Sequence, residues 1–108
     1  MVAPQSTPSR ILYVKAPYLR QLRKNLTPYL IRVEDLSATK DTTIYVADGR
    51  QTLSCLVKDV IRIPIEKVPR IVLDKNGYKT REQLRGNLRE MTKLETLTDV
   101  TILELAVQ

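Results

Sequence analysis

The sequence predicts a small α+β domain in which five to six mostly antiparallel strands are flanked by two helices. Two alternating segments around an Asp-Gly pair predict a long hairpin, two stretches carry apolar residues at helical spacing, and another alternating segment closes the chain. A chain of 108 residues has room for one domain and one core. We expect residues 1–9 to be a flexible tail without the apolar run of a signal peptide, and residues 10–108 to form the domain.

The first third of the chain predicts a strand, a helix and a second strand. Residues 10–14 predict a short strand, and leucines at helical spacing predict a helix over residues 16–26. Pro17 falls in the first turn of that helix, where its missing N–H is tolerated. Residues 27–33 are expected to be extended, with Pro28 near the start of the strand.

The middle of the chain predicts a hairpin. Residues 42–47 and 50–63 flank Asp48-Gly49, the signature of a two-residue hairpin turn. Alternation places two sets of residues of the second arm on opposite faces: an apolar set of Leu53, Cys55, Val57, Ile61 and Ile63, and a polar set of Arg50, Thr52, Ser54, Lys58 and Arg62.

The last third predicts a helical turn over residues 64–68, a turn at Asp74 to Gly77, a helix and a closing strand. Thr80 is expected to cap the helix, with Gln83 completing a Thr-x-x-Gln capping box. The helix has an apolar stripe of Leu84, Leu88 and Met91, and alternation over residues 99–106 predicts the strand.

The net charge of +6 is concentrated in one part of the chain. Residues 1–33 contain no acid and six bases: Arg10, Lys15, Arg20, Arg23, Lys24 and Arg32. The other 75 residues balance at twelve bases and twelve acids. A concentrated basic region is typical of proteins that bind polyanions, because cations that neutralise phosphates release counterions. The alternative is a solvated face that keeps the protein soluble.

Several kinds of site are excluded by composition. The chain has no histidine, so an imidazole base and histidine metal ligands are excluded. Its one cysteine, Cys55, cannot form an internal disulfide or a cysteine zinc site, and its apolar strand face favours a core thiol over a reactive one. We expect no metal and no cofactor. No segment approaches the length of a membrane span, so we expect no membrane partner and a cytoplasmic location.

One local cluster has the residue types of a reactive site. Lys24 and Thr27 follow the first predicted helix, and Arg32 lies on the next strand. Together they could line one pocket, with lysine as a base if burial lowers its pKa and threonine as a nucleophile or donor. The alternative is a surface lysine and a threonine that begins a strand.

Three stretches resemble the ASCH family of the PUA-like superfamily over about residues 10–106: RKNLTPYLIR, LVKDVIRIPIEKV, and NGYKTREQLRGNLREM followed by DVTILEL. The resemblance implies a small PUA-like β-barrel and recognition of RNA or a modified nucleoside in a cleft beside the first helix. Some small ASCH proteins are amidohydrolases that act on acetylated cytidine through a Lys-x-x-Thr pair and a glutamate before the second helix. Lys24 and Thr27 match the pair, but this chain has Asn76 and Gly77 where the glutamate would stand.

We therefore expect a non-catalytic RNA-binding domain. Lys15, Arg20, Arg23, Lys24 and Arg32 would contact phosphates, and Tyr18 or Tyr29 would stack on a base. The basic surface is extended by Arg81, Arg85 and Arg89, unless these only form a solvated helix edge. Two alternatives remain open: a hydrolase acting on a modified nucleoside or RNA through Lys24 and Thr27, and an interaction module whose basic third docks an acidic protein.

Overall fold

The computed structural model describes residues 11–34, 36, 38–92 and 99–108. Its elements, in chain order, are β1 (Ile11–Tyr13), α1 (Ala16–Arg23), β2 (Tyr29–Arg32), β3 (Thr43–Ala47), β4 (Thr52–Pro64), the 3-10 helix η1 (Ile65–Lys67), α2 (Arg70–Lys75), α3 (Arg81–Thr92) and β5 (Asp99–Val107). The predicted order is confirmed, with α2 as an addition. The tail predicted over residues 1–9, Arg10, and the side chain of Met91 lie outside what the structure describes.

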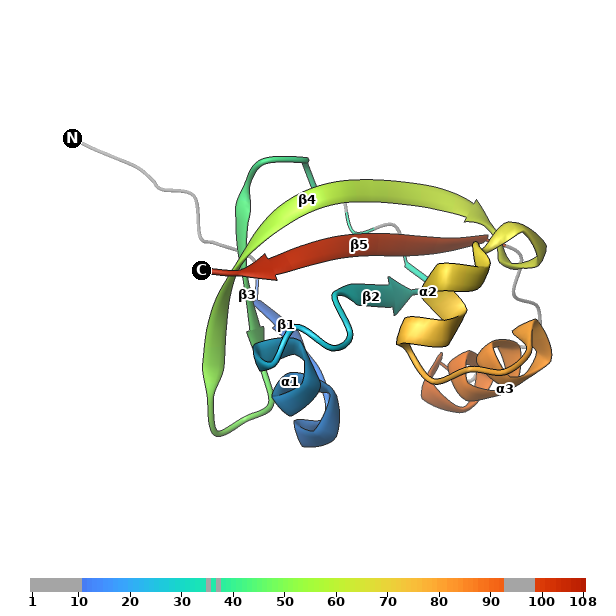
Figure 1. Cartoon of the computed structure of the whole chain (residues 1–108), viewed down its shortest axis with the longest axis horizontal. Coiled ribbons are helices and arrows are strands. Elements are labelled where there is room, and N and C mark those ends of the chain that lie inside the picture. Colours follow the sequence, from blue (N-terminus) through green and yellow to red (C-terminus); the bar gives the residue numbers. More distant parts are fainter. Residues whose placement is uncertain (1–10, 35, 37, 93–98) are drawn as a thin grey trace.

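The five strands form one curled sheet in the order β1-β3-β4-β5-β2. β1 runs parallel to β3, and the other neighbours are antiparallel. In Figure 1 the long strands β4 and β5 arch over the molecule, with α1 near one end of the arch and α2 and α3 near the other. The predicted α+β class and mostly antiparallel sheet are confirmed.

Two apolar clusters pack on opposite sides of β5. Leu103 belongs to a cluster with Leu19 and Leu22 of α1, whereas its neighbour Ile102 belongs to a cluster with Leu73 of α2 and Leu84 of α3. Neighbouring residues of a strand point to opposite faces, so each cluster lies on its own face of the sheet. β2 is an edge strand beside β5, and its residues contribute to both clusters. This edge therefore lies between α1 and the α2–α3 pair.

The predicted faces of β4 are correct only as far as Val57. Pairing with β5 shifts register between Val57 and Asp59, which marks a β-bulge. An extra residue in the ladder exchanges the two faces of the strand beyond it. Val60 therefore packs against the same cluster that contains Val57, while Ile63 packs against the other cluster. The prediction that Ile61 and Ile63 share a face with Leu53, Cys55 and Val57 is wrong for this reason.

The turn between β3 and β4 is longer than predicted. Ala47 pairs with Thr52, so the loop comprises four residues rather than two. Asp48 Oδ1 accepts hydrogen bonds from the backbone N–H groups of Arg50 and Gln51, both at 2.8 Å. This side-chain turn replaces the tight two-residue turn, and only the glycine at position 49 has a positive φ, at +94°.

The second half of the chain follows its local signals except at α2. Thr80 Oγ1 accepts a hydrogen bond from Gln83 N at 3.1 Å, which confirms the predicted cap. The Gln83 side chain returns to the residue before the cap, because its Oε1 accepts a hydrogen bond from Lys79 N at 2.7 Å rather than from Thr80 N. The α2 helix was not predicted, because its Ile71 and Val72 are β-branched and disfavour helix locally. Burial of Val72 and Leu73 in the second cluster outweighs that preference.

No helix among the described residues is long and apolar enough to span a membrane.

Candidate functional site

The end of α1 determines where the predicted site residues point. Asn25 adopts a φ of 61° and its N–H donates to Leu22 O, while Leu26 N donates to Gln21 O, both at 2.9 Å. These two bonds form a Schellman motif, which reverses the chain just after the helix. Thr27 consequently turns inward and is only 5% exposed, whereas Lys24 remains on the exposed side of the helix end.

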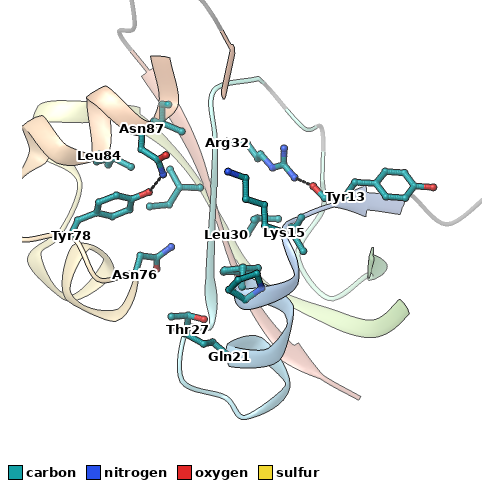
Figure 2. A pocket seen from close by; sticks show the side chains of 15 residues that line it. Tyr13, Lys15, Gln21, Thr27, Leu30, Arg32, Asn76, Tyr78, Leu84 and Asn87 are labelled. Carbon is teal, nitrogen blue, oxygen red and sulfur yellow. Dashed lines mark hydrogen bonds between the residues drawn. The ribbon is translucent and has the colours of Figure 1, made fainter. Parts of the chain in front are cut away.

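A pocket of about 420 Å³ lies between α1 and α3, around the edge strand β2 (Figure 2). One wall comes from the segment that leads into α1 and from the helix itself, and the other comes from the α2–α3 connection and α3. The lining residues are Tyr13, Val14, Lys15, Pro17, Tyr18, Gln21, Thr27, Leu30, Ile31, Arg32, Asn76, Tyr78, Leu84, Asn87 and Leu88. Its size is in the range of small-molecule sites, roughly 300–1,000 Å³.

Several residues that line this pocket carry buried polar atoms without partners. Among the described residues, four buried side-chain nitrogen or oxygen atoms have no hydrogen-bond partner, and three of them belong to the pocket residues Thr27, Arg32 and Asn76. The Asn76 amide is oriented by its Nδ2, which donates to Tyr29 O at 3.1 Å, so Oδ1 is the free acceptor. A buried polar group without a partner costs about 1–3 kcal/mol. The site therefore favours a ligand with both donors and acceptors.

The pocket is positively charged. Lys15 and Arg32 are the charged residues among its described lining, which contains no carboxylate. In Figure 2 the Lys15 side chain extends into the space between the two walls, and Arg32 lies beside it with a hydrogen bond to Tyr13 O. The Tyr13 ring points away from the pocket. No group of three or more residues that could hold a metal occurs in the described part of the chain.

Of the two tyrosines predicted to stack on bases, one reaches the pocket. Tyr18 lines it, but its hydroxyl donates to Tyr29 O at 3.0 Å and burial raises its pKa well above the usual range. Its ring is therefore a fixed part of the wall. Tyr29 packs against the second cluster and does not line the pocket. Tyr78 also lines the pocket; it is half-buried, as Tyr18 is, and its hydroxyl accepts a hydrogen bond from Asn87 Nδ2.

The predicted Lys24–Thr27 pair is not brought together. Thr27 lines the pocket, but Lys24 lines a separate hollow on the other side of α1, together with Arg20 and Arg23. The chain reversal at Asn25 is the physical reason, because it directs the residues before and after it to different surfaces. Lys15 and Arg32, both predicted as phosphate contacts, supply the charge of the pocket instead.

The predicted arginines of α3 do not line the pocket either. Arg81 Nη2 donates to Val68 O at 2.7 Å, and Arg85 forms an ion pair with Glu66 at 2.9 Å. The hydrogen bond from Arg85 lowers the pKa of the Glu66 carboxyl. Arg89 is exposed and also lies outside the pocket lining. The face of α3 toward the pocket carries leucines and Asn87.

Sequence reasoning missed the far wall of the site. Asn76 lay in a predicted turn and Tyr78 just after it, and no local spacing connects them with Thr27 about fifty positions earlier. The only available signal was composition: the five tyrosines are the only aromatic residues of the chain, but the sequence analysis chose Tyr18 and Tyr29 and not Tyr78. Cys55 is fully buried in β4 and burial raises its pKa to about 11, so the predicted core thiol is confirmed.

Comparison with known proteins defines the class of fold. No family model matches the sequence, and no curated protein matches it. Solved structures do match. The hypothetical protein PH0355 matches with a TM-score of 0.73 and 14% identity over 94% of this chain and 100% of that one. EF3133 from Enterococcus faecalis V583, of family DUF984, matches with a TM-score of 0.75 and 10% identity over 94% of this chain and 82% of that one. ASCH from Zymomonas mobilis matches with a TM-score of 0.64 and 8% identity over 88% of this chain and 64% of that one.

These matches and the half-barrel sheet show a small α+β domain with a PUA-like fold. More particularly, the chain has an ASCH-like fold, as its sequence resemblance implied.

Proposed function

We propose that this protein is a small RNA-binding domain that holds one unstacked nucleotide of a single strand in the pocket between α1 and α3, without catalysis. The observation that carries the proposal is that Thr27, Arg32 and Asn76, each with a buried polar atom that has no partner in the folded chain, line the same pocket as Lys15. The ASCH-like fold supports it, because the resemblance implies RNA recognition beside the first helix. A cytoplasmic location is part of the same proposal.

The pocket chemistry suits a nucleotide. Asn76 Oδ1 accepts a hydrogen bond from an N–H on the edge of a base, and the Thr27 hydroxyl can donate or accept. Lys15 and Arg32 attract the phosphate, and the Tyr78 ring offers a surface for stacking. Only an unpaired base can enter a pocket of this size, because paired bases are stacked inside a duplex. We therefore expect single-stranded RNA to bind better than double-stranded RNA.

The hydrolase alternative receives no support from the geometry. It required Lys24 beside Thr27, and these residues line different hollows. No carboxylate among the described pocket residues is positioned to act as a general base. Binding without turnover is therefore the function we propose. Release of acetate from acetylcytidine at a rate that depends on Lys24 would contradict it.

Fluorescence anisotropy with a labelled single-stranded RNA of about eight nucleotides, a typical site size, tests the proposal. We expect Thr27→Val and Asn76→Leu each to weaken binding about 5- to 10-fold, because each removes one ligand hydrogen bond. Thr52→Val, at an exposed position of β4, is the matched control and should bind like the wild type. Equal affinity of all four proteins, or no binding by the wild type, would overturn the proposal.

A further inference from the structure

A second hollow of about 350 Å³ lies on the opposite side of α1 from the pocket. It is formed by α1 and the turn between β3 and β4, which lie at the same end of the molecule (Figure 1). Four exposed cations line it, and we refer to them together as the basic seam: Arg20, Arg23, Lys24 and Arg50.

The cations of the basic seam are not neutralised within the described chain. The ion pairs of the described residues involve Arg70 and Arg85, and none includes a member of the seam. One carboxylate, that of Asp48, lies in the same hollow. It accepts the two backbone hydrogen bonds of its turn, which lower its pKa and keep it ionised. Four cations therefore face one carboxylate, and this surface attracts anions.

The seam is held in shape by the fold. Arg23 Nη2 donates to Gln51 Oε1 and so connects the end of α1 with the hairpin turn. The backbone bonds to Asp48 fix the loop that carries Arg50. Three of the four cations are arginines, whose planar guanidinium groups can donate two parallel hydrogen bonds to a phosphate. A carboxylate can accept the same pair of hydrogen bonds, so it is the nucleotide proposed for the neighbouring pocket, and not the type of cation, that selects phosphate here.

We propose that the basic seam binds the sugar-phosphate backbone of the same RNA strand whose base enters the pocket, so that the strand crosses α1. This inference rests on the proposed function of the pocket. An α-helix with its side chains is about 10–12 Å wide. Phosphates of a fully stacked strand are about 3.4 Å apart along the axis and those of an unstacked strand are farther apart, so at most about three to four nucleotides separate the two sites. A single nucleotide fills the pocket without reaching the seam.

The experiment compares a nucleoside monophosphate with the labelled RNA of about eight nucleotides, each titrated at several salt concentrations. The seam variant is Arg20→Gln with Arg50→Gln. Its matched control, Lys67→Gln with Arg89→Gln, removes the same charge from exposed positions outside both hollows. Circular dichroism checks that both variants are folded.

We expect the seam variant to lower the slope of log affinity against log salt by about 1.4, at about 0.7 for each lost phosphate contact with a single strand. The wild type should bind the RNA more tightly than the monophosphate, and the seam variant should lose most of that difference. Its affinity for the monophosphate should equal that of the wild type. The control should change neither value. An unchanged slope in the seam variant, with Thr27→Val still weakening binding, would overturn the inference but not the proposed function. Binding of a polyglutamate peptide through the seam in place of RNA would also overturn it.

Discussion

Arg32 on β2 donates a hydrogen bond to the carbonyl oxygen of Tyr13 on β1, although these two strands are the opposite edges of the sheet. The half-barrel is therefore bridged at this point by a side chain, where a closed barrel would have a backbone ladder. Arg32 also lines the pocket, so one residue connects the two edges and presents a cation to the ligand site.

Arg32→Lys should lower the free energy of unfolding by about 1 kcal/mol, the usual value of one such hydrogen bond. Lysine keeps the charge but has no forked guanidinium group. In Arg32 that fork allows Nη2 to reach Tyr13 O while the Arg32 Nε stays buried. Urea denaturation measures the change, with Arg20→Lys on the exposed face of α1 as the control. Equal stability of the two variants would mean that the bridge does not stabilise the fold.

Asn25→Ala should destabilise the protein by about 1 kcal/mol, because a residue with a Cβ other than Asn or Asp disfavours the φ of 61° that closes α1. Asn25→Gly should match or slightly exceed wild-type stability, since glycine adopts this conformation freely. Thermal denaturation of both variants checks the ranking. A result in which alanine is as stable as glycine would show that this chain reversal is not required.

Thr101→Val should cost about 1–2 kcal/mol of unfolding free energy. The buried Thr101 Oγ1 accepts from Arg62 Nη1 at 2.6 Å and donates to Glu34 O at 2.9 Å, and valine has the same shape without the hydroxyl. Urea denaturation gives the difference, and Thr43→Val on an exposed position of β3 should change stability little. If the two variants are equally stable, the contact between the bulged part of β4 and the segment after β2 contributes nothing.

Stability should fall as pH rises from about 9 to about 11, in part because of Cys55. Burial raises the thiol pKa from 9.0 to about 11, so the folded state keeps a proton that the unfolded state loses in this range. The thiol contribution is complete below pH 9 and is lost as the pH passes the folded value. Unfolding curves of the wild type and Cys55→Ala across this range isolate it, and the wild type should have the steeper pH dependence. Parallel curves would contradict the assignment.

Periodicity alone predicted the elements whose residues interact with near neighbours. Alternation identified the two arms of the hairpin and β5, leucine spacing identified α1, and the Thr80–Gln83 pattern located the start of α3. The apolar position of Cys55 on its strand predicted its burial correctly. These features depend on how apolar residues repeat within one segment, and that repeat can be seen in consecutive residues of the sequence.

Tertiary structure decided the features that depend on which segments pair. The bulge near Asp59 arises only against β5 and exchanges the faces of β4 beyond it, and α2 forms because Leu73 and its neighbours are buried. Asn76 and Tyr78 reach the pocket because α2 and α3 pack in one cluster with Ile31 of β2, and Asn76 Nδ2 donates to Tyr29 O of the same strand. The sequence by itself located the excess charge in the first third. Only the fold divided that charge, since Arg20, Arg23 and Lys24 on and just after α1 line the seam, whereas Lys15 and Arg32 line the pocket on the other side of the helix.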